Sequence, residues 1–100
     1  MILALLWTVQ TAQPAGYTPQ EQRAVVATME CQRRHLQTVP GRERRQRGEA
    51  LIEEAFSACA AEEAALRVLL RSRFNEQATE QALEIVREGS RDGMRSYIRR

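Results

Sequence analysis

Two cysteines set the strongest constraint on how this chain can fold, because they stand in separate stretches of helical sequence. Cys31 and Cys59 are the only cysteines among the 100 residues. Their midpoint is residue 45, in an arginine-rich connection that begins with Pro40 and Gly41. If the stretches on either side fold back antiparallel about this connection, the two cysteines come level and can form a disulfide. In the chain-entropy model such a bond stabilises the fold by ~3–4 kcal/mol.

The sequence after the first seventeen residues favours helices and gives little support for strands. Ala, Glu, Gln, Arg and Leu dominate it, and these are strong helix formers. Apolar residues recur every three or four positions, without the alternation that is typical of strands. We predict an all-α protein: an antiparallel helical hairpin and a third helix in a small three-helix bundle, with one disulfide between helices. The predicted helices cover residues 19–38, 48–74 and 76–98.

The first helix has readable boundaries. Thr18 is placed to cap it, Pro19 fits the first helical position, and Glu21 completes a capping box. The helix should end before Pro40, since the residue before a proline is pushed out of the α region. Residues 42–47 leave an alternative open. If they are helical, the turn tightens at Pro40 and either the first helix tilts or the connection absorbs the offset.

The second and third helices carry the main apolar stripes. At the centre of the longer stripe, Phe56, Leu66 and Leu70 are expected to be among the most buried side chains. In the third helix the apolar face is expected to include Ile85. The glycines at 89 and 93 are expected to weaken or break this helix, because an interior glycine costs about 1 kcal/mol relative to alanine.

The second helix is longer than the first, so its far end lacks cover from that helix. We expect an exposed apolar patch around Leu69, Leu70 and Phe74. Such patches on small proteins commonly mark contacts, and this one favours weak self-association or the docking of a partner helix.

Residues 1–17 are interpreted as an apolar leader, either a signal peptide or an N-terminal arm. The first twenty residues carry no charge, and the apolar run from Ile2 to Trp7 is too short to span a bilayer. A positive n-region and a clean cleavage site are missing, which favours an arm that packs on the body. Against this, a leader ahead of a two-cysteine domain over 18–100 is typical of an exported protein. We expect a periplasmic or secreted location.

No motif in the sequence indicates catalysis. A P-loop, a nucleophile-elbow serine, an HExxH helix and a glycine-rich dinucleotide turn are all absent. We therefore expect neither enzymatic activity nor a cofactor. His35 stands one helical turn from Cys31, a spacing that suits a Cys–His dyad or half of a zinc site. Only Cys59 and a glutamate are left to complete such a set, so no metal site is expected.

An arginine-rich segment is the candidate binding site, and the alternative is that its charges are simply solvated. The functional interpretation is contact with an anionic partner, such as the headgroups of an envelope surface or an acidic protein. The net charge of +2 is too small to indicate nucleic acid. The candidate residues are Arg42, Arg44, Arg45 and Arg47.

Residues 17–22 resemble the Leu-Thr-x-x-Gln signature of small helical periplasmic stress chaperones of the Spy type. Tyr17 stands in place of the leucine, Thr18 matches, and Glu21 stands in place of the glutamine. The resemblance covers six residues that also form a general helix start, so it transfers no function.

Taken together, the sequence predicts a small exported helical protein of the cell envelope that acts as a binding or structural module for an unknown partner. One alternative is a periplasmic protein similar to stress chaperones, or a metal-responsive one. The other is a cytoplasmic helical adaptor with free thiols.

Overall fold

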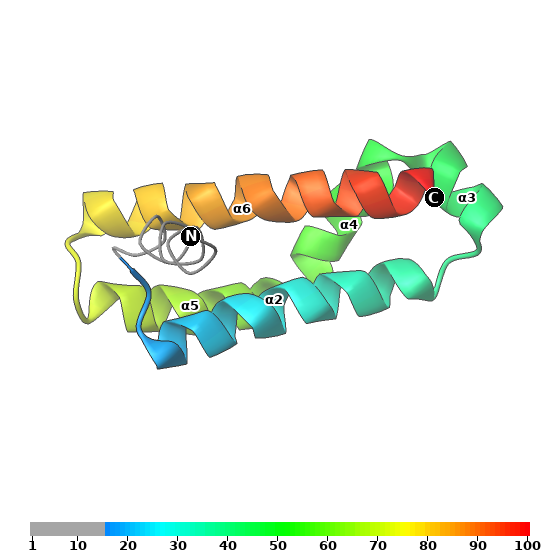
Figure 1. The fold of residues 1–100 in the computed structure, drawn as a ribbon. Helices are drawn as coiled ribbons and strands as arrows, with labels where there is room; N and C mark the ends of the chain where they lie inside the picture. The colour runs from blue at the N-terminus through cyan, green and yellow to red at the C-terminus, as the bar shows by residue number, and fades with distance from the viewer. Residues whose placement is uncertain (1–15) are drawn as a thin grey trace, which may run out of the picture.

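The computed structural model describes residues 16–100, which form an all-α protein as predicted (Figure 1). The described residues form α2 (Pro19–Gln37), α3 (Gly41–Arg47), α4 (Glu49–Ala58), α5 (Ala60–Arg71) and α6 (Glu76–Arg99). The proposed leader lies outside the described residues, except for its last two. Within the described part, no helix is both long enough and apolar enough to cross a bilayer.

Three rods of helix lie side by side. The first is α2, the second consists of α4 followed by α5, and the third is α6. The second rod runs antiparallel to the other two, so α2 and α6 run in the same direction along the molecule (Figure 1). The short helix α3 lies at one end, where the chain turns from the first rod into the second.

The start of α2 follows from its capping residues. Thr18 Oγ1 accepts a hydrogen bond from the Glu21 N–H at 3.1 Å, and the Glu21 carboxylate accepts one from the Thr18 N–H at 3.0 Å. The helix ends at Gln37, one residue before the predicted boundary. The capping box and the stop before Pro40 are therefore both confirmed.

The predicted disulfide is present and links α2 to the junction of α4 and α5. The Cα atoms of Cys31 and Cys59 are 5.9 Å apart. One turn further along, His35 Nε2 lies 2.7 Å from the Glu54 carboxylate, which keeps the same antiparallel register. Residues 42–47 do form a helix, and Gly48 absorbs the offset. Its φ of 51° with ψ of −122° redirects the chain in a conformation that favours glycine.

The prediction of one continuous second helix over 48–74 was wrong. The chain departs from helical geometry at Cys59, where φ is −108° and ψ is 23°, and the helix ends at Arg71. No glycine or proline stands near this junction. The break lies at the disulfide, and the helices on its two sides, α4 and α5, pack into different cores.

Two separate apolar cores hold the rods together. The first joins α4 to the ends of α2 and α6, and the second joins α5 to the other half of α6. The first core contains Leu36, Val39, Leu51, Ile52, Ala55, Met94 and Ile98. The second core contains Leu66, Leu70, Leu83 and Val86.

Small and polar residues occupy the level between the two cores on every rod. They are Thr28 and Gln32 on α2, Cys59 in the second rod, and Ser90 on α6, all buried. We call this level the middle layer. Because apolar packing is interrupted there, the disulfide is the strongest tie between the first two rods at this level.

Some of the burial predictions need correction. Leu66 and Leu70 are fully buried as expected, but Phe56 is only half-buried, with the Arg91 guanidinium 4.9 Å above its ring. The assignment of Ile85 to the apolar face was wrong, since it is 65% exposed and Leu83 takes the buried position. Which residues lie at the edge of the apolar face of α6 depends on where the two neighbouring rods lie. The periodicity of the sequence does not give those positions.

The predicted exposed patch at the end of α5 is also wrong. Leu70 is fully buried, and Leu69 and Phe74 are half-buried. Tyr17 and residues of α2 and α6 pack against this end of the second core, so the chain covers it with its own side chains. The glycines at 89 and 93 do not break α6, which is continuous over 24 residues.

Ion pairs connect the rods on the outside. Arg95 pairs with Glu49 at 2.7 Å, and Arg91 and Arg87 pair with Glu53 and Glu63 further along α6. At the opposite end, Arg73 donates to the buried Glu21 carboxylate at 2.7 and 2.8 Å. These hydrogen bonds hold the pKa of Glu21 below its ordinary value, against the opposing effect of burial.

We predict that Glu21→Gln lowers the free energy of unfolding at pH 7 by about 1–3 kcal/mol. Glutamine keeps the capping position but loses the ion pair with Arg73. A lowered folded-state pKa stabilises above the ordinary value of 4.5 and loses its effect as the pH falls through the lowered value. The difference from wild type should therefore shrink in acid, as measured by urea unfolding. Glu76→Gln, in an exposed pair with Arg71, is the control. Equal losses in both variants would contradict this.

Candidate functional site

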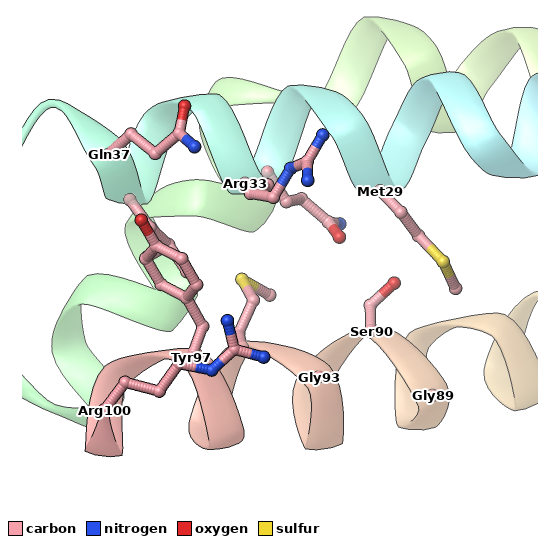
Figure 2. Close-up of a pocket in the computed structure, with 11 residues that line it drawn as sticks. Met29, Arg33, Gln37, Gly89, Ser90, Gly93, Tyr97 and Arg100 are labelled. Atoms are coloured by element: carbon pink, nitrogen blue, oxygen red, sulfur yellow. The ribbon is translucent and has the colours of Figure 1, made fainter.

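An open groove lies between α2 and α6 on the surface of residues 16–100 (Figure 2). Its volume of about 410 Å³ is within the range of pockets that hold small ligands. Five residues of α2 and six of the α6 segment line it. They are Met29, Gln32, Arg33, Leu36 and Gln37, with Gly89, Ser90, Gly93, Met94, Tyr97 and Arg100. We call this site the α2/α6 groove.

Two glycines form one wall of the groove and leave it empty. Among the described residues, a Cβ atom added at Gly93 would meet nothing within 4 Å, and one at Gly89 would meet only the Met29 methyl, at 4.0 Å. Both glycines are inside a regular helix, where each costs about 1 kcal/mol relative to alanine. Neither a turn nor a close neighbour among the described residues requires Gly93. Its visible effect is the open space between the helices.

Ser90 places a buried polar group against this space. The residue is 4% exposed, and its Oγ is one of three buried side-chain atoms without a hydrogen-bond partner in the described part of the chain. The other two, in Arg44 and Thr79, belong to residues that do not line the groove. Figure 2 shows the Ser90 hydroxyl pointing away from α6 toward α2. An unpaired buried hydroxyl is costly, and a bound polar atom would satisfy it.

The charged side chains at the groove are arginines. Arg33 comes from α2 and Arg100 from the end of the α6 segment, and none of the described side chains that line the groove is acidic. Arg33 contacts Glu30 at 3.3 Å in an exposed pair, which is worth at most about 1 kcal/mol. The groove therefore favours an anion at its rim.

An aromatic ring closes one end of the groove. The ring of Tyr97 stands between the two helices near Gln37 (Figure 2). Two cations lie near this ring, with the guanidinium carbon of Arg44 4.9 Å and that of Arg100 5.6 Å from the ring centre. The groove is thus a short recess with one blocked end.

The structure places the arginine-rich segment beside this closed end. Arg44 donates to the Leu36 and Val39 carbonyl oxygens at 3.3 and 2.6 Å and so caps the end of α2. Arg45 donates to the Arg100 carbonyl at 3.4 Å. Arg47 pairs with Glu43 and Glu54, and Arg42 is exposed on α3. Three of the four predicted anion-contact residues are thus engaged within the protein.

The cysteines do not form the alternative site that His35 suggested. The ligand atoms of Cys31, Cys59 and Glu62 lie within 4.8 Å of one another, as a metal site would require. However, the two sulfur atoms are bonded to each other, so neither is a thiolate ligand. His35 faces Glu54 instead, and this contact holds the pKa of the Glu54 carboxyl below its usual value.

A second hollow, of about 360 Å³, lies where α4 and α5 face α6. Its charged residues are already paired, Glu53 with Arg91 and Glu63 with Arg87. Glu63 also lies 3.9 Å from Arg67. These pairs satisfy the side chains that a charged ligand would need.

Sequence reasoning missed the groove as a site. The spacing of Gly89 and Gly93 was visible, and with Ser90 between them it marks a face of α6 that lacks bulk. Which helix faces that surface, and at what distance, depends on the packing of all three rods. Comparisons of the chain with protein families, with curated proteins and with solved structures found no match.

We predict that Gly93→Ala raises the free energy of unfolding by about 0.5–1 kcal/mol, because the new methyl group enters open space while the helix gains propensity. Gly48→Ala should instead lower it by about 1 kcal/mol or more, since its φ of 51° strains other residues. Chemical denaturation of both variants checks this. A Gly93→Ala protein that is less stable than wild type would show that the groove is closed in solution.

Proposed function

We propose that this protein is a small exported binding module of the cell envelope that holds a partly apolar small molecule in the α2/α6 groove. The observation that carries this proposal is the wall formed by Gly89, Ser90 and Gly93. Two interior glycines and a buried hydroxyl without a partner among the described residues all lower stability, and all three line the same open groove. Stability given up at one surface is a common mark of a binding site.

The composition of the groove supports the binding of a ligand with mixed character. Met29, Leu36 and Met94 provide apolar contacts, and methionine adapts readily to different ligand shapes. Gln32 and Ser90 provide polar contacts at the buried side of the groove. Apolar walls with a few placed polar groups are typical of small-molecule sites.

The disulfide supports the location outside the cytoplasm. Disulfides persist in the periplasm and in secreted proteins and are rare in the reducing cytosol. Cys31 and Cys59 lie at the centre of the fold, where the middle layer lacks apolar packing. A protein built around this bond depends on an oxidising compartment.

Counting of thiols tests the location. The protein is taken from its native host, denatured in the presence of an alkylating reagent and weighed by mass spectrometry. We expect no alkylated cysteine, because Cys31 and Cys59 are bonded to each other. Two alkylated cysteines would instead support the cytoplasmic adaptor with free thiols.

Fluorescence of N-phenyl-1-naphthylamine, an uncharged apolar probe, tests the groove. We expect 1:1 binding to the oxidised protein with increased emission, and loss of this signal in Gly93→Leu, whose side chain fills the groove. Val68→Ser is the control, because Val68 is 67% exposed on α5 and offers a non-specific apolar contact. Thermal melting confirms that both variants are folded. Equal emission from wild type and a folded Gly93→Leu would contradict the proposal.

A further inference from the structure

We propose that the ligand of the α2/α6 groove is a single anionic amphiphile, an unbranched apolar chain that ends in a carboxylate. This inference rests on the proposed function and adds the chemical class of the ligand. Three observations carry it: the charge at the rim, the shape of the recess and the unpaired hydroxyl of Ser90.

The charge at the rim selects an anion. Arg33 and Arg100 line the groove from opposite helices, and no acidic side chain among the described residues lines it. The guanidinium carbon of Arg100 lies 5.6 Å from the centre of the Tyr97 ring. Guanidinium groups bind carboxylates through paired, charge-assisted hydrogen bonds. A carboxylate at the rim would therefore pair with these guanidinium groups more favourably than an uncharged headgroup would.

The shape of the recess selects a short, narrow chain. From Met29 to Gln37 the groove follows eight residues of α2, or about 12 Å at the rise of an α-helix. The Met29 side chain reaches into the space beside Gly89, and Tyr97 blocks the other end (Figure 2). The volume of about 410 Å³ suits one flexible chain. A free inorganic anion would leave these apolar contacts unused.

The buried hydroxyl separates this ligand from a docked helix. Ser90 Oγ has no partner in the described part of the chain and faces the groove. The apolar face of a partner helix would cover Ser90 and leave its hydroxyl unpaired, at a cost. A polar atom of a small ligand that enters the groove can accept a hydrogen bond from the Ser90 hydroxyl, which the apolar face of a helix cannot do.

An anionic membrane surface fits the arrangement less well. Arg44, Arg45 and Arg47 make contacts within the protein and leave only Arg42 of the predicted segment exposed to solvent without such a contact among the described residues. Electrostatic binding to a membrane needs several exposed cations together. The groove instead concentrates its two cations around one recess.

Isothermal titration calorimetry of the oxidised full chain with octanoate, 1-octanol and acetate tests the proposal. Octanoate should bind 1:1, 1-octanol should bind about 10-fold more weakly because it lacks the charge, and acetate should give no measurable heat. Arg33→Gln and Arg100→Gln should each weaken octanoate binding by about 5- to 10-fold and leave 1-octanol binding unchanged. Ser90→Ala should weaken octanoate binding by about 3-fold.

Arg34→Gln is the matched control. Arg34 follows Arg33 on α2 and also contacts Glu30, at 3.9 Å, but it does not line the groove. It should leave octanoate binding unchanged.

The outcomes separate the ligand class from the proposed function. Equal affinity for octanoate and 1-octanol, or equal effects of Arg33→Gln and Arg34→Gln, would overturn the anionic class while the groove remains a binding site. If acetate binds as tightly as octanoate, the apolar chain contributes nothing to binding. The groove would then be a simple anion site, which would overturn the proposal of an amphiphilic ligand. If the protein co-sediments with phosphatidylglycerol vesicles but does not bind octanoate, it binds an anionic membrane surface and not a single amphiphile. Failure of both 1-octanol and the uncharged fluorescent probe to bind would contradict the proposed function itself.

Discussion

The disulfide between Cys31 and Cys59 is the constraint on which the arrangement of this protein depends. It crosses the bundle at the middle layer, where small and polar residues on all three rods interrupt the apolar packing. On either side, a separate apolar core holds the rods together. A covalent link at the level of weakest packing keeps α2 fixed to the second rod, and it does so without filling the space between α2 and α6.

The open groove follows from this arrangement, in which the disulfide ties the rods at the middle layer and the two cores pack on either side of it. α2 contacts the second rod much more extensively than it contacts α6, so those two parallel helices can stand apart at the middle layer. Gly89, Ser90 and Gly93 then face open space, and the stability they give up is supplied by the disulfide and the two cores. Arg44 also helps to close the groove, because it caps the end of α2 and packs against the Tyr97 ring at the closed end.

Local signals in the sequence predicted local features well. The capping box at Thr18 and the level position of the two cysteines depend on residues close in sequence or on simple antiparallel geometry. The break at Cys59 and the exposure of Ile85 were not predictable in this way. Both depend on how α4, α5 and α6 share two cores, which is a property of the assembled rods.

The groove and the role of Arg44 were hidden for the same reason. In the sequence, a cluster of arginines indicates only solvated charge. The fold brings backbone carbonyls and Tyr97 within contact distance of one of these arginines, Arg44. Likewise, two glycines four residues apart indicate a thin face of a helix, but not the distance to the helix opposite. The composition of the site was visible in the sequence, whereas its geometry required the tertiary structure.

The central claim is that the middle layer is open between α2 and α6 and takes up an amphiphile there. The protein has three methionines, and Met29 and Met94 both line the groove. Selective ¹³C labelling of methionine methyl groups therefore permits a direct NMR measurement of nuclear Overhauser effects to bound octanoate. The account predicts contacts from the octanoate chain to the methyl groups of both Met29 and Met94. Saturating octanoate that gives no contact to either methyl group would contradict it.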